Sequence, residues 1–213
     1  MAGLLDVLGP ALSGTTLQQL SQTVGANEQT TKRAAFAALP LLLGAMNKNT
    51  NDPEGARSLA TALEQDHDGS LLDHVGGFLG ALQGAPGSTA AFGVPNVDGR
   101  ATNGIGILRH IFGAELPRVE QGVGKAAGLD REQVTRMLVA LAPMVMAYLG
   151  RQKREQNLDA GGLSDLLRRE AGTAREAAPN DLLGTIGSFL DRDKDGNPLD
   201  DVAGMLGGFL GKR

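Results

Sequence analysis

The sequence predicts an all-α protein built from two similar helical repeats, and three observations support this prediction. Apolar residues recur at helical rather than alternating spacing, as in Met137, Leu138, Leu141 and Val145. Blocks of sequence recur in the same order in the two halves of the chain. Aromatic residues make up only 3% of the 213 residues, so the core must consist of aliphatic side chains suited to close helix packing. We find no pattern typical of a β-strand.

The first recurring block contains a glycine, a helix start and a proline. Gly25 and Pro40 recur as Gly128 and Pro143, with the same offset of 103 positions (128 − 25). Asn27 and Asp130 follow the glycines at equal spacing, and each is predicted to cap the next helix. Gln133 stands three residues after Asp130, the spacing of a capping box. The two prolines fall inside these helices and are expected to kink each helix or divide it into two.

A second block, residues 66–80, recurs at 193–207 with a larger offset of 127 positions (193 − 66). The difference predicts an insertion in the second copy, whose many charged residues indicate an exposed extra helix and loop. The Gly, Pro, Ser and Thr content between the copies is typical of a linker. We therefore predict helical repeat 1 at 1–84, a linker at 85–104, and helical repeat 2 at 105–213 with an insertion at about 151–181.

Composition excludes several classes of site. The absence of cysteine excludes disulfides, zinc–thiolate sites and cysteine nucleophiles. A formal net charge of −4 argues against non-specific nucleic-acid binding.

The sequence shows no pattern typical of a secretory signal or a membrane span. Asp6 and Pro10 interrupt the first apolar stretch, whereas a secretory signal has an uninterrupted one. The longest uncharged segments, 34–47 and 137–150, are shorter than the roughly 20 residues that span a bilayer. We expect a cytoplasmic protein without a transmembrane helix.

The acidic segment near residue 195 has the spacing of a calcium loop. Asp191, Asp193 and Asp195 stand at positions 1, 3 and 5 of a DxDxDG pattern, whose glycine permits the sharp turn. Val202 stands at position 12, where an EF-hand has a bidentate acid, so the loop is not a standard EF-hand. We predict Ca²⁺ as the ligand, held by Asp191, Asp193, Asp195, Asn197, Asp200 and Asp201.

The corresponding loop of the first repeat is a weaker candidate. His74 stands where the second loop has Asp201, and histidine is a poor ligand for a hard cation. Helix capping explains part of both loops without a metal, because Ser70 with Asp73, and Asn197 with Asp200, fit an N-cap followed by an acid at N3. The weaker second site is predicted at Glu64, Asp66, Asp68 and Asp73.

A glycine-rich helix is predicted after each acidic loop. Four-residue glycine spacing lets two helix backbones approach closely. Each glycine costs about 1 kcal/mol relative to alanine inside a helix, so a steric requirement is indicated. Packing between the two repeats is one explanation, and self-association into a homo-oligomer is the other. The glycines concerned are Gly76, Gly80, Gly84, Gly204, Gly207, Gly208 and Gly211.

Three features together resemble the YidB-like family of bacterial proteins of unknown function. They are GLLD near the start, the segment from Gly25 to Pro40, and the DxDG loop followed by a glycine-rich tail. The resemblance implies an all-helical, homeodomain-like unit, present here as a tandem duplication. It implies no established activity and no catalytic residues.

The sequence favours a structural or interaction protein over an enzyme. It contains no Ser/His/Asp order, Gly-rich phosphate loop or HExxH motif, and no small-molecule substrate is evident. We therefore expect a non-enzymatic protein that binds calcium and self-associates. The alternative is a nucleic-acid-binding protein with a helix-turn-helix at residues 17–43. Its second helix continues from Lys32 and Arg33 into AAFAALPLLL, which is typical of a core, so nucleic acid is not the expected partner.

Overall fold

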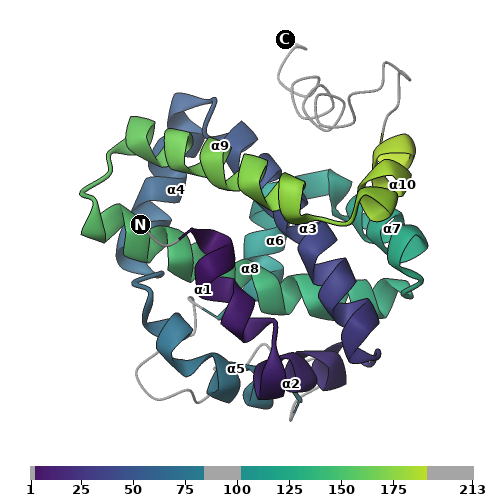
Figure 1. Cartoon of the computed structure of the whole chain (residues 1–213). Coiled ribbons are helices and arrows are strands. Elements are labelled where there is room, and N and C mark those ends of the chain that lie inside the picture. The colour runs from purple at the N-terminus through teal and green to yellow at the C-terminus, as the bar shows by residue number, and fades with distance from the viewer. Residues whose placement is uncertain (1–2, 84–101, 191–213) are drawn as a thin grey trace.

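The computed structural model describes residues 3–83 and 102–190, and every regular element in these ranges is a helix (Figure 1). The first half contains α1 (Leu4–Ala11), α2 (Gly14–Val24), α3 (Glu28–Asn49), α4 (Pro53–Gln65), the 3-10 helix η1 (Ser70–His74) and α5 (Val75–Gln83). The second half contains α6 (Gly104–Phe112), η2 (Gly113–Glu115), α7 (Leu116–Ala127), α8 (Arg131–Glu155), α9 (Ala160–Ala177) and α10 (Asn180–Leu190). The all-α prediction is confirmed for these ranges.

The predicted helix boundaries in the first sequence block are confirmed. Gly25 and Gly128 have φ of 79° and 70°, the left-handed conformation in which glycine commonly ends a helix. Asn27 caps α3 by accepting a hydrogen bond from a backbone N–H three residues later, at 2.8 Å. Asp130 and Gln133 form the reciprocal capping box of α8, with distances of 2.8 and 3.0 Å. These caps place the two longest helices immediately after tight turns.

Both prolines lie inside continuous helices. Helix α3 runs through Pro40 and α8 runs through Pro143, so neither proline divides its helix, and the expected kink stays a prediction. Each proline is buried in the apolar core, where packing along the helix offsets the roughly 3 kcal/mol that an internal proline costs.

A single buried cluster joins the two halves of the chain. Leu39 and Leu42 of α3 belong to the same hydrophobic core as Leu138 and Leu141 of α8. Helix α9 packs along α3, while α2 and α6 both contact α8. Figure 1 shows α3 and α8 in the middle of the molecule, with the other helices around them. The linker prediction at 85–104 falls largely outside the described residues, and the repeat boundaries stay a prediction.

Helix α8 is long and apolar enough, by length and composition, to cross a membrane. However, 78% of its apolar window is buried within the molecule. Its apolar side chains therefore contact other helices, as the sequence predicts for a core helix.

The segment predicted as a charged insertion, 151–181, contains helix α9, and one face of α9 is buried although exposure was expected. Leu163, Leu167 and Glu170 are buried, whereas Arg168 and Arg169 are exposed. Apart from Glu170, the charged residues of α9 lie on its outer face, and the apolar face of α9 covers α3.

The buried carboxylate of Glu170 connects three helices. It accepts a hydrogen bond from the backbone N–H of Leu4 at 2.8 Å and one from the Tyr148 hydroxyl at 2.7 Å. It therefore satisfies an N–H at the start of α1, where the helix end also favours a negative charge. Burial, followed by the hydrogen bond to Glu170, raises the pKa of Tyr148 well above its usual range.

Tyr148 is the chain's single tyrosine, and tryptophan is absent, so ultraviolet absorbance reports its ionisation directly. We predict that tyrosinate appears only as the protein unfolds, and not as the pH passes about 10, the usual pKa of tyrosine. Unfolded chains lose this proton first, so the free energy of unfolding should fall as the pH rises above that value. Tyrosinate formation near pH 10 with unchanged helical circular dichroism would contradict this contact.

Candidate functional site

The acidic loop of the first half, residues 64–73, packs against the last turns of α8. The turn at Gly69 has φ of 89°, a left-handed conformation that favours glycine. On the α8 side, a Cβ added to Gly150 would lie 1.7 Å from the His67 carbonyl oxygen. The backbones of the loop and α8 can approach this closely only because Gly150 has no side chain.

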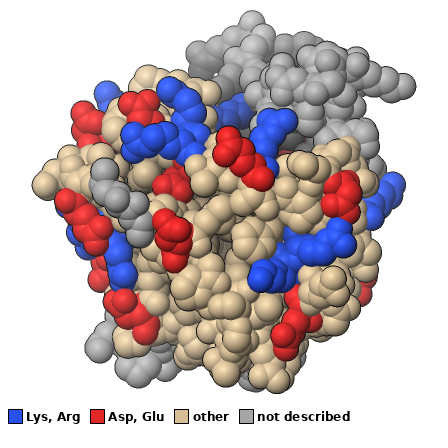
Figure 2. Space-filling model, viewed as in Figure 1, with Lys and Arg blue, Asp and Glu red and all other residues tan. Residues whose placement is uncertain are grey.

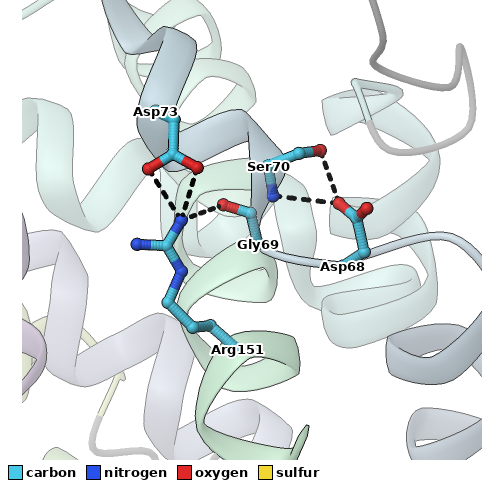
Figure 3. Close-up of polar contacts among 5 residues, drawn as sticks. All are labelled: Asp68, Gly69, Ser70, Asp73 and Arg151. Carbon is cyan, nitrogen blue, oxygen red and sulfur yellow. Dashed lines mark hydrogen bonds and ion pairs between the residues drawn. The ribbon is translucent and has the colours of Figure 1, made fainter. Parts of the chain in front are cut away.

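Arg151 fastens this loop to α8 (Figure 3). One guanidinium nitrogen, Nη2, lies 2.7 Å from the Gly69 carbonyl oxygen and 2.9 Å from each carboxylate oxygen of Asp73. The Arg151 side chain is 32% exposed and that of Asp73 is 62% exposed, so solvent weakens the ion pair. The cation nevertheless contacts both a backbone carbonyl and a carboxylate, the two ligand types that calcium takes from such loops. We call this set of contacts the Arg151 clasp.

The other acids of the loop have separate partners. Asp68 accepts hydrogen bonds from the Ser70 hydroxyl and, at 2.9 Å, from the Ser70 backbone N–H (Figure 3). These bonds, the hydroxyl first, hold the pKa of the Asp68 carboxyl below its usual range, and the charge of Arg154 acts in the same direction. Glu64 pairs with Lys153 of α8. The loop thus lies against a basic stretch at the end of α8.

The capping explanation needs a correction. Ser70 was expected to cap the helix with Asp73 at N3, but Ser70 is the first residue of η1. Asp68 holds the Ser70 N–H instead, and Asp73 pairs with Arg151. The difference arises because the helix start is set by the turn at Gly69.

The metal prediction gains no support from this loop. Within residues 3–83 and 102–190, no group of three or more His, Cys, Asp or Glu side chains is placed to hold a metal ion. Calcium at Glu64, Asp66, Asp68 and Asp73 stays a prediction. The main predicted site lies outside the described residues, at Asp191, Asp193, Asp195, Asn197, Asp200 and Asp201.

The predicted glycine contacts are described only in α5. Phe78 and Leu79 are fully buried, and α5 packs on α2. A Cβ on Gly76 would lie 3.4 Å from Gln19 Oε1, but one on Gly80 would meet nothing within 4 Å. Packing among the described residues therefore does not explain Gly80. The remaining glycines, Gly84, Gly204, Gly207, Gly208 and Gly211, lie outside the described residues.

Sequence reasoning missed Arg151, the residue that organises this loop, because it was grouped with the charged insertion at about 151–181. It also missed the contact between Gln133 and the Gly25 carbonyl oxygen, at 2.6 Å, which joins α8 to the end of α2. The basic run RQKR directly after an apolar helix was a signal, but its partner loop lies far away in the sequence.

Two glycine substitutions test the clasp. In Gly69→Ala, the alanine backbone would have to adopt a strained left-handed conformation, and its Cβ would lie 2.8 Å from the Arg151 Cβ. We expect a loss of about 1 to 3 kcal/mol in the free energy of unfolding. Gly77→Ala is the control, because its Cβ would meet nothing within 4 Å, and it should be neutral or stabilising by up to about 1 kcal/mol. Urea unfolding at low protein concentration measures both, and equal effects would contradict the described loop.

Comparison with known proteins gives one family. A search of curated proteins and a search of solved structures returned no match. The family described as "Bacterial protein of unknown function (DUF937)" matches residues 6–152. The resemblance to YidB-like proteins is consistent with this match, which runs as one range across both halves and so does not show a tandem duplication. Because the match covers more than half of the chain, this protein belongs to that family of bacterial proteins of unknown function.

Proposed function

We propose that this chain is a non-enzymatic interaction protein that self-associates through the surface formed by α2 and α5. The observation that carries the proposal is that neither helix contains any Asp, Glu, Lys or Arg. In Figure 2 the lower middle of the face, where these helices lie, is mostly tan, with acidic residues to either side. The exposed residues of this uncharged surface are Gly14, Thr15, Gln18, Gln22, Gly77, Gly80 and Gln83.

Charge depletion is characteristic of the centre of protein interfaces, because buried charges lose hydration that a partner must replace. Glycine at positions 77 and 80 adds a second argument. Each costs about 1 kcal/mol relative to alanine inside a helix. A Cβ at either position would meet nothing within 4 Å, so no neighbour within the described chain requires a glycine there. The approach of a second backbone gives these glycines a role.

Calcium binding by residues 191–201 is a further part of the proposal, and it rests on the spacing of their carboxylates. In the first loop, Arg151 and Lys153 supply positive charge to Asp73 and Glu64. Carboxylates crowded in this way need such compensation, because like charges repel. A Ca²⁺ ion would supply it in the second loop.

The proposal also includes a tandem duplication. Its support is that equivalent positions play equivalent roles, with a left-handed glycine ending α2 and α7 and a side-chain cap starting α3 and α8. Pro40 and Pro143 lie at matching points in α3 and α8. The homeodomain-like arrangement within each repeat remains part of this proposal.

Nucleic-acid binding by α2 and α3 has less support than self-association. Helices α2 and α3 stand at the positions of a helix-turn-helix, but α3 is buried at nearly every residue from Ala34 to Leu43. Lys32 and Arg33 are exposed at its start, and Arg33 pairs with Asp181. A recognition helix needs a polar face free to enter a groove, so no described feature favours this function.

Adding charge to the uncharged surface tests self-association. We expect the mass measured by light scattering to rise with protein concentration for the wild-type chain. Gln18→Lys with Gln22→Lys should weaken this association at least about tenfold, because each partner would bury or oppose like charges. Gln29→Lys with Gln121→Lys adds the same charge at exposed sites outside α2 and α5 and should leave it unchanged. A wild-type chain that stays monomeric at every concentration would refute the proposal.

Calorimetric titration with Ca²⁺ tests the metal site. We expect Asp195→Ala to weaken binding at least about tenfold, since it removes one carboxylate ligand. Asp165→Ala removes an exposed carboxylate outside both acidic loops and should leave the titration unchanged. A wild-type titration without heat up to millimolar Ca²⁺ would exclude the site.

A further inference from the structure

His74 lies beside the exposed glycines of the uncharged surface. The 3-10 helix η1 ends at His74, and Val75, the first residue of α5, also has a right-handed helical backbone, so η1 and α5 form one continuous helical segment. Residues three apart are neighbours on a helix surface. His74 is therefore next to Gly77, and Gly77 is next to Gly80, and all three are exposed. The imidazole thus lies at the edge of the surface through which we propose self-association.

His74 is the group at this surface whose charge changes near neutral pH. Helices α2 and α5 contain no Asp, Glu, His, Lys, Arg or Tyr. Imidazole ordinarily gains its proton between about pH 8 and pH 5, a range in which carboxylates stay ionised and Lys and Arg stay protonated. No described residue forms a hydrogen bond or an ion pair with the His74 side chain. Acidification therefore converts a neutral edge of the surface into a charged one.

The carboxylate next to His74 in the sequence already has a cationic partner. Helices α5 and α8 pack against η1. From α8, Arg151 Nη2 lies 2.9 Å from each carboxylate oxygen of Asp73 (Figure 3). The other charges of the loop and the last turns of α8 that have described partners are Glu64 with Lys153, and Asp68 with Arg154. A proton on His74 therefore adds a positive charge that Asp73, held by Arg151, does not offset.

We infer that protonation of His74 dissociates the self-associated protein, so that association through α2 and α5 is strong at neutral pH and weak at mildly acidic pH. This inference rests on the proposed self-association and adds its regulation. When two uncharged surfaces meet, a charge at their edge loses hydration that the partner does not replace. Because the separated molecule binds the proton more readily, a fall in pH shifts the equilibrium towards it.

The pH dependence of association tests the inference with a matched control. In chelator and at constant ionic strength, light scattering should show wild-type association weakening at least about fivefold between about pH 8 and pH 5.5. His74→Gln should associate equally at both pH values. His110→Gln removes an exposed imidazole on α6, outside the surface, and should keep the wild-type response. The third histidine, His67, is buried and is present in every variant. A pH response that persists in His74→Gln would overturn the inference.

A permanent charge at the same position gives the complementary test. At pH 8, His74→Lys should associate about as weakly as the wild-type chain does at pH 5.5, with unchanged helical circular dichroism. Association of this variant as tight as that of the wild type at pH 8 would contradict the role of His74. A wild-type chain that associates equally at both pH values would overturn the inference while leaving the proposed function standing. A wild-type chain that is monomeric at every concentration and pH would refute both.

Discussion

The structure depends on burying two long apolar helices, α3 and α8, against the rest of the chain. Their sequences are apolar around most of their circumference, with buried residues from Ala34 to Leu43 and from Ala140 to Gly150. Neither helix can bury its apolar surface against the elements of its own half alone. Helix α9, from the second half, covers α3, and α2, from the first half, contacts α8. The two halves are therefore held together by hydrophobic burial.

Polar contacts fix the positions of the surrounding helices on this core, and each joins segments distant in sequence. Glu170 holds the start of α1, Gln133 holds the end of α2, and Arg151 holds the acidic loop. In all three cases a side chain from the second half contacts a backbone group of the first half. Such contacts contribute less energy than the core, but their directionality sets where each element packs.

Sequence patterns correctly predicted the structural features that depend only on neighbouring residues. The capping residues Asn27 and Asp130, the glycines that end α2 and α7, and the helical class all follow from local rules. Sequence patterns failed to predict features that depend on contacts between segments distant in the sequence. The charges of α9 suggested exposure although the opposite face is apolar, and Arg151 was assigned to the insertion because its partner loop lies 78 residues earlier. At Asp68 and Asp73, where the acidic spacing suggested a metal, the described partners are Ser70 and Arg151, and calcium binding there stays a prediction.

Because both halves share one core, we expect them to unfold together, and equilibrium unfolding in urea tests this most directly. Far-ultraviolet circular dichroism follows the helices of both halves, whereas the fluorescence of Tyr148, the single tyrosine, follows α8 alone. A core common to both halves predicts that the two signals change together in one transition. A first transition seen by circular dichroism while the Tyr148 signal remains native would contradict the shared core.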